Sequence, residues 1–176
     1  MGKLRICSPS RLSRELELII LISGLPGVGK SSFSRTLARE CGYSHYDMER
    51  VQTWPRHELH SLWDASRTSF VSALASAHAG KAVLDWGFPP VYLPWIAELK
   101  AAGVVVCWFY ADEPLARKSY LARDPGGIDA FERQLRLIKD SGLPQGLGAI
   151  EVEAVTTAGY RDWQECWQTI QEGRHN

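Results

Sequence analysis

Residues 24–31 carry the clearest chemical pattern in the sequence, because they read Gly-Leu-Pro-Gly-Val-Gly-Lys-Ser. They complete the phosphate-binding pattern G-x-x-x-x-G-K-[ST]. The glycines let the backbone curl and present N–H groups to phosphate oxygens, and a following helix adds the positive end of its dipole. The pattern therefore predicts a site for ATP and Mg²⁺, in which Lys30 reaches the β- and γ-phosphates and Ser31 binds the metal. The expected nucleotide contacts are Gly24, Pro26, Gly27, Val28, Gly29, Lys30, Ser31 and Ser32.

Two carboxylates fall at the ends of expected strands, and each has a use in phosphoryl transfer. Asp47 follows a short strand, where a carboxylate can orient an acceptor hydroxyl and accept its proton. Asp85 follows an apolar run that matches a Walker B strand, so we expect it to hold Mg²⁺ together with Ser31. Simpler interpretations stay open, since Asp47 could cap a helix and Asp85 could form the turn before Gly87. Asp85 is also the alternative base.

Apolar runs alternate with segments of helical periodicity, which is typical of a parallel α/β sheet. The expected strands are 17–23, 43–46, 81–85, 104–110 and 149–154. The expected helices are 29–41, 55–79, 90–102, 113–123, 128–140 and 159–171. Ligands of such sheets gather at the carboxyl ends of the strands, so the loop and both carboxylates should meet at one edge.

The composition indicates a single globular domain. The chain has 176 residues, and its 20 basic and 20 acidic residues give a net charge of zero, which counts against a general nucleic-acid binder without excluding a local basic channel. The four cysteines are far apart, which argues against a zinc site or disulfide framework and favours a reduced, cytoplasmic setting. No apolar run reaches transmembrane length, so we expect no membrane partner. We assign residues 1–15 to a polar extension and 16–176 to the domain, as a monomer or homodimer.

From about residue 16 to 171 the chain resembles the P-loop kinases of the nucleoside-monophosphate-kinase-like group. This group includes gluconate and shikimate kinases, chloramphenicol phosphotransferase and polynucleotide 5′-kinases. The resemblance rests on the phosphate-binding loop, the chain size, the order of the elements and the acids at the strand ends. It implies a single α/β P-loop domain with a five-stranded parallel sheet in order 2-3-1-4-5, helices on its faces and a short lid. It also implies transfer of the γ-phosphate of ATP to a hydroxyl of a small-molecule acceptor.

The resemblance assigns roles to several polar residues. In similar kinases an acid at the position of Asp47 faces the acceptor hydroxyl, and a mobile lid carries arginines that close over the phosphates. Here the break at residues 124–127 would be the lid, with Arg123 as the catalytic arginine and Arg117 as a nucleotide contact. The spacing Asp47-x-x-Arg50 resembles the acceptor site of polynucleotide 5′-kinases, which makes Arg50 a candidate substrate contact.

Trp54 and Trp86 fall in expected loops just beyond strand ends. We predict that they wall the acceptor pocket or stack on a ring of the acceptor, although core packing is the competing explanation. The sequence does not identify the acceptor itself.

Two other functions stay open. A polynucleotide 5′-hydroxyl kinase would explain the Asp47-x-x-Arg50 spacing and the loop tryptophans, but the zero net charge counts against it. A nucleotide-binding regulatory protein with little turnover would use the loop as a switch. The complete set of Lys30, Ser31, Asp47 and Asp85 favours retained chemistry instead.

Overall fold

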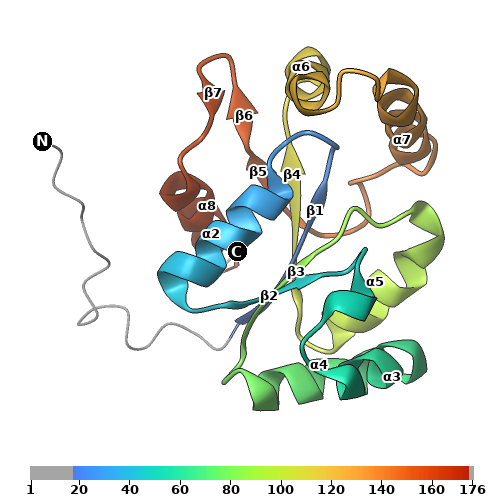
Figure 1. Ribbon diagram of the computed structural model, residues 1–176, viewed down its shortest axis with the longest axis vertical. Helices are drawn as coiled ribbons and strands as arrows, with labels where there is room; N and C mark the ends of the chain where they lie inside the picture. The colour runs from blue at the N-terminus through green and yellow to red at the C-terminus, as the bar shows by residue number, and fades with distance from the viewer. Residues whose placement is uncertain (1–17, 175–176) are drawn as a thin grey trace, which may run out of the picture.

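Five parallel strands form the centre of the computed structural model, which describes residues 18–174 (Figure 1). Their order is β2-β3-β1-β4-β5, which confirms the predicted order 2-3-1-4-5. The strands are β1 Leu18–Gly24, β2 Ser44–Asp47, β3 Lys81–Asp85, β4 Val105–Tyr110 and β5 Ile150–Glu153. The predicted extension at residues 1–15 lies outside the described residues.

Helices cover both faces of this sheet (Figure 1). In the described residues they are α2 Lys30–Cys41, α3 His57–Ala65, α4 Arg67–Ala77, α5 Leu93–Ala101, α6 Glu113–Arg123, α7 Ile128–Asp140 and α8 Trp163–Gly173. Successive side chains of a strand point to opposite faces, so β1 supplies two cores at once. Ile19 and Leu21 pack with α3, α4 and α5, whereas Ile20 and Ile22 pack with α2, α6, α7 and α8. No described helix is long and apolar enough to cross a bilayer.

The register of the sheet brings the two predicted carboxylates together. β2 and β3 pair in parallel with Asp47 opposite Asp85. On the other side of β3, Asp85 pairs with Ile22 near the end of β1, directly before the phosphate-binding loop. The carboxyl ends of three neighbouring strands therefore place the loop and both acids at one edge.

The prediction of one long helix over residues 55–79 is wrong. The helix is broken at Ser66, whose backbone is extended with φ −162° and ψ 118°. Its side chain accepts a hydrogen bond from the Ser69 N–H at 3.2 Å and so caps the start of α4. Serine is a favoured helix cap, and this local interaction overrides an apolar periodicity that continues through the break.

The last predicted helix, over residues 159–171, begins later than expected. Val155–Thr156 and Gly159–Tyr160 form an antiparallel hairpin, β6 and β7, before α8. Asp162 then caps α8 by accepting a hydrogen bond from the Gln164 N–H at 2.8 Å. The predicted helix over 90–102 likewise starts with a 3₁₀ turn, Pro90–Tyr92, ahead of α5.

Trp54 and Trp86 are core residues, with exposed fractions of 4% and 6%, and neither lines the cavity in front of the phosphate-binding loop. Trp54 stacks on Phe70 of α4 with ring centroids 5.5 Å apart, and its indole N–H donates to the Asp47 carbonyl oxygen at 2.8 Å. Trp86 packs edge-on against Trp63 of α3. Trp54 therefore links the end of β2, which carries Asp47, to α4.

We expect Trp54→Phe to lower the free energy of unfolding by about 1–3 kcal/mol. The change removes the hydrogen bond to the Asp47 carbonyl and leaves space where the larger indole packed. Urea unfolding followed by circular dichroism measures the loss. Val91→Ala is the matched control, because Val91 is 76% exposed and should change stability by less than about 0.5 kcal/mol. Equal stabilities of the two variants would contradict the structural role of Trp54.

Candidate active site

The phosphate-binding loop joins β1 to α2 through glycines with positive φ, among them Gly24 at 131° and Gly27 at 83°. A Cβ at Gly24 would lie 1.9 Å from the Phe109 carbonyl oxygen, and one at Gly27 would lie 2.6 Å from the Ala116 carbonyl oxygen. The Leu25 N–H also donates to the Phe109 oxygen at 3.0 Å. The loop is thus held so close to β4 and α6 that side chains cannot replace these two glycines.

Lys30 lies across this loop. Its Nζ donates to the carbonyl oxygens of Leu25 at 2.7 Å and Gly24 at 3.2 Å. Burial lowers the pKa of Lys30 to about 8, while the nearby carboxylates of Asp85 and Glu49 act in the opposite direction. The ammonium is therefore half-buried beside the loop without a hydrogen-bonded carboxylate among the described residues.

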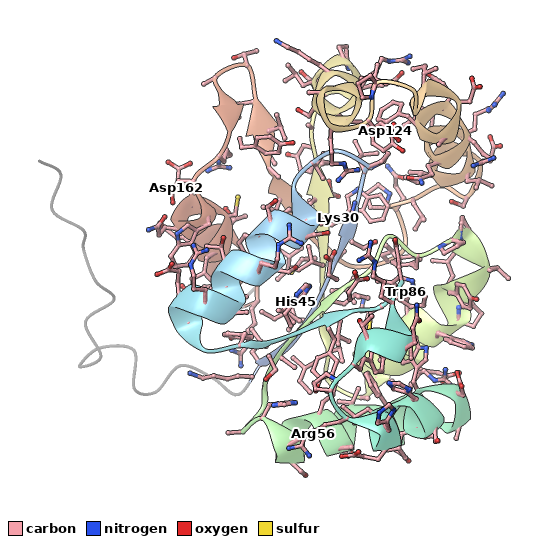
Figure 2. All side chains as sticks on the ribbon, in the orientation of Figure 1. Lys30, His45, Arg56, Trp86, Asp124 and Asp162 are labelled. Carbon is pink, nitrogen blue, oxygen red and sulfur yellow. The ribbon has the colours of Figure 1, made fainter. Side chains whose placement is uncertain are left out.

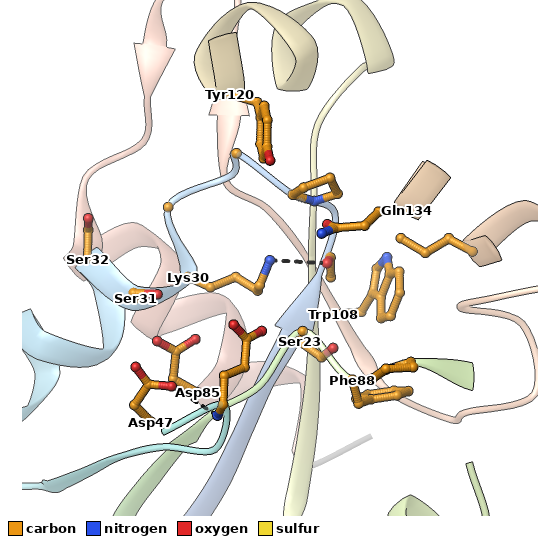
Figure 3. A pocket seen from close by; sticks show the side chains of 18 of the residues that line it. Ser23, Lys30, Ser31, Ser32, Asp47, Asp85, Phe88, Trp108, Tyr120 and Gln134 are labelled. Atoms are coloured by element: carbon orange, nitrogen blue, oxygen red, sulfur yellow. Dashed lines mark hydrogen bonds between the residues drawn. The ribbon is translucent and has the colours of Figure 1, made fainter. Parts of the chain in front are cut away.

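A cavity of about 490 Å³ opens in front of the loop (Figure 3). Its size falls within the usual range for small-molecule sites. The ends of β2 and β3, the segments that follow these two strands, β4, α6 and α7 also line it. The predicted residues that it brings together are Gly24, Pro26, Gly27, Gly29, Lys30, Ser31, Ser32, Asp47, Asp85 and Arg123.

Both predicted carboxylates face this cavity, and Figure 3 shows them below Lys30 and Ser31. Asp85 is only 6% exposed. Asp47 Oδ1 accepts a hydrogen bond from the Glu49 N–H at 3.0 Å, so it stabilises a turn after β2 rather than the start of an α-helix. Asp47 Oδ2 forms an ion pair with the exposed Arg50, at 3.7 Å, and accepts no hydrogen bond from the described residues, so a ligand in the cavity can compete for it.

The oxygen atoms of Ser31 and Asp85 have the chemistry that Mg²⁺ prefers. Among residues 18–174, no group of three or more His, Cys, Asp or Glu side chains could hold a metal ion by itself. Mg²⁺ in phosphate-transfer sites usually keeps one or two protein oxygens and takes its other ligands from phosphates and water. The Ser31 and Asp85 pair fits that pattern, with Mg²⁺ binding together with a nucleotide.

Three predicted contacts lie outside the cavity. Arg50 is 72% exposed and forms its ion pair with Asp47 at the surface. Arg117 forms ion pairs with Glu113, at 3.1 Å, and with Glu132 of α7, so its charge is already paired between α6 and α7. Val28 is 1% exposed in the core, which leaves only its backbone to meet a phosphate.

Arg123 is the lid arginine that does line the cavity. Its guanidinium lies 5.4 Å from the ring centroid of Tyr120, which lines the same cavity. The connection after it is a tight turn, closed by the Gly127 N–H donating to the Asp124 carbonyl at 3.0 Å. Movement of this segment stays a prediction.

Sequence reasoning missed Glu49 and His45. Glu49 lines the cavity two residues after Asp47. His45 precedes Asp47 by two residues on β2, so the two share a face of the sheet. Its buried Nε2 lies 3.6 Å from Asp85 Oδ2 and has no hydrogen-bond partner among residues 18–174. The two-residue period of a strand could have indicated His45, whereas the position of Glu49 depends on the turn that follows.

A second, smaller cavity of about 260 Å³ shares Gly29 and Ser32 with the first. Tyr160 and Arg161, from the hairpin and its exit, line it. The Tyr160 hydroxyl donates to the Gly27 carbonyl oxygen at 2.8 Å. The hairpin that replaces the expected helix start thus brings an aromatic ring and a guanidinium next to the loop.

No protein-family model and no curated protein matches the sequence. Solved structures match the fold across most of the chain. A shikimate kinase from Acinetobacter baumannii in complex with shikimate has a TM-score of 0.57 at 19% identity, covering 90% of this chain and 96% of that one. A gluconokinase from Sinorhizobium meliloti 1021 has a TM-score of 0.55 at 15% identity, covering 91% and 93%. The chain therefore has the fold of the small P-loop kinases, as the sequence resemblance predicted.

Proposed function

We propose that this protein is a kinase that transfers the γ-phosphate of ATP to a hydroxyl group of a small molecule. The observation that carries the proposal is the convergence of Lys30, Ser31, Asp47 and Asp85 on one cavity at the carboxyl edge of the sheet. The structural likeness to a gluconokinase and a shikimate kinase is consistent with it at the level of the fold.

In this mechanism the loop N–H groups and Lys30 bind the β- and γ-phosphates and set the nucleotide in place. Ser31 and Asp85 would hold Mg²⁺, which offsets phosphate charge when bound. Asp47 orients the acceptor hydroxyl and takes its proton as the oxygen attacks the γ-phosphorus, and ADP departs. Arg123 donates to the charge that develops on the transferred group.

The nucleoside would extend from the phosphates into the second cavity. That cavity begins at Gly29 and Ser32, which also line the phosphate cavity. Its Tyr160 ring offers a surface for stacking, and Arg161 adds a hydrogen-bond donor.

The small-molecule acceptor is favoured over a polynucleotide. The features that suggested a 5′-hydroxyl kinase were Arg50 and the loop tryptophans. Arg50 is paired with Asp47, and Trp54 and Trp86 are buried in the core. The cytoplasmic location and the monomeric or homodimeric state expected from the sequence remain predictions.

The test is acceptor-dependent release of ADP. Purified protein with MgATP is screened against sugars, nucleosides, antibiotics and 5′-hydroxyl oligonucleotides, with the Arg117→Ala variant as a control outside the cavity. A kinase releases ADP rapidly only when its acceptor is present. Tight ATP binding without stimulation by any acceptor would instead support the regulatory protein with little turnover.

Affinity for MgATP should fall as the pH rises above about 8. In the unliganded protein burial lowers the pKa of Lys30 to about 8, so the ammonium loses its proton as the pH rises through that value. Bound phosphate favours the charged form, so the pKa of Lys30 is higher in the complex. The affinity for MgATP is therefore highest below the pKa of Lys30 in the unliganded protein and declines above that value. At a pH just above that pKa, binding of MgATP is accompanied by uptake of a proton.

Calorimetry in two buffers with different ionisation enthalpies measures that proton uptake. Lys30→Arg is the matched control, because arginine stays charged throughout this range. The pH profile of the variant should be flatter than that of the parent. Identical profiles would show that Lys30 does not titrate in the site.

A further inference from the structure

The half of the cavity beyond the loop has an acidic side and an apolar side. Figure 3 shows Asp47 and Asp85 on one side and Phe88 and Trp108 on the other. Glu49 adds a third carboxylate to the lining. Phe88 and Trp108 are 6% and 3% exposed, so their positions are held by the core behind them.

Glu49 is positioned by two backbone features. Its N–H donates to Asp47 Oδ1, which fixes the turn after β2. Its Oε1 lies close to Gly87, since a Cβ there would make a tight contact of 3.1 Å with that oxygen. Gly87 does not have the positive φ that would require glycine for backbone reasons. The glycine therefore avoids a tight contact with the Glu49 carboxylate.

The Glu49 carboxylate has no hydrogen bond or ion pair with the part of the chain that the structure describes. In the unliganded protein both Glu49 and Asp85 attract the charge of Lys30, which raises the pKa of Lys30 against the effect of burial. In the proposed complex, Lys30 binds the phosphates of the nucleotide and Asp85 helps to hold Mg²⁺. Asp47 and Glu49 are then adjacent carboxylates of the acceptor side. The remaining described cations of the lining are Arg123, which the proposed mechanism assigns to the transferred phosphate, and the exposed Arg35. Such a pair favours a positively charged ligand.

We propose that the acceptor is an amino alcohol with an apolar face. Its hydroxyl meets Asp47, its ammonium pairs with Glu49, and its apolar face lies against Phe88 and Trp108. This inference rests on the proposed kinase function and names the chemical class of its acceptor. A carboxylate on the acceptor would face Asp47 and Glu49, so hydroxy acids should be excluded.

Matched probes that differ in one group test this assignment. One set is 2-amino-1-phenylethanol, 1-phenylethane-1,2-diol and mandelate. The other is glucosamine, glucose and glucuronate, in which each charged probe differs from glucose in one group. Each is assayed for binding in the presence of a non-hydrolysable ATP analogue with Mg²⁺, and for ADP release with MgATP. The amine should be preferred over the neutral probe by at least about tenfold, and the acid should be the weakest.

Glu49→Gln should remove that preference while MgATP affinity stays unchanged. The control is Glu151→Gln, because Glu151 is an exposed carboxylate of β5 outside the cavity. Glu49→Lys should reverse the order and favour the acids. A kinase that prefers neutral or acidic probes, or binds none of the amines, overturns the inference. So does a Glu49→Gln variant with weakened MgATP binding and an unchanged probe order, because Glu49 would then serve the nucleotide.

Failure of the proposed function gives a different result. A protein that does not bind MgATP, or that binds amines without acceptor-dependent ADP release, contradicts the kinase assignment. Preference for an acid with rapid ADP release contradicts only the acceptor class.

Discussion

Asp47→Asn should lower acceptor-dependent turnover by about 10²–10⁴-fold. The amide keeps the size of the side chain and can still accept the hydrogen bond from the Glu49 N–H, so the turn after β2 should persist. It cannot accept the proton of the acceptor hydroxyl. MgATP affinity should stay nearly unchanged, because the proposed contacts of the nucleotide are the loop, Lys30 and Ser31. Steady-state ADP release and calorimetric MgATP binding separate the two effects.

Asp85→Asn is the matched comparison, since Asp85 is the register partner of Asp47 on the neighbouring strand. Its proposed partner is the metal, so this variant should need more Mg²⁺ and bind nucleotide more weakly. The two roles would be exchanged, with Asp85 as the base, if Asp47→Asn turned over normally and Asp85→Asn bound MgATP but had no activity. If neither substitution changes turnover, the kinase proposal fails.

Lys30→Ala should cost about 3–4 kcal/mol of transition-state stabilisation, which is on the order of 10²–10³-fold in kcat/KM. The ammonium lies across the loop and is the proposed partner of the β- and γ-phosphates. Lys118→Ala is the control, because Lys118 is an exposed residue of α6 outside the cavity.

The fold should survive the loss of Lys30. Burial that lowers the pKa of a lysine means that the charged form is less favourable in the folded state than in the unfolded state. Alanine is also a strong helix former at the start of α2. The free energy of unfolding should therefore be similar in the parent and the variant at neutral pH. Equal MgATP affinity in a folded Lys30→Ala variant would contradict the phosphate-binding assignment.

The sequence by itself predicted the parts of this protein that depend on local pattern. The loop is recognisable because its glycines, Lys30 and Ser31 are contiguous, and each has a chemical reason for its place. The bounds of α6, α7 and β3 match their predictions because apolar periodicity and strong breakers coincide there. Asp47 and Asp85 could be placed at one edge because parallel strands end at the same side of a sheet.

Only the tertiary structure decided which polar side chains reach the cavity. The sequence predicts Arg117 as a phosphate ligand, but in the structure it forms an ion pair with Glu132 of another helix. Trp54 lies in a loop, as the sequence predicts, but its ring is buried against Phe70 of α4. Glu49 lines the cavity with its carboxylate close to Gly87, which is distant in sequence. Each outcome depends on contacts between segments far apart in the chain. The local periodicity of the sequence does not indicate such contacts.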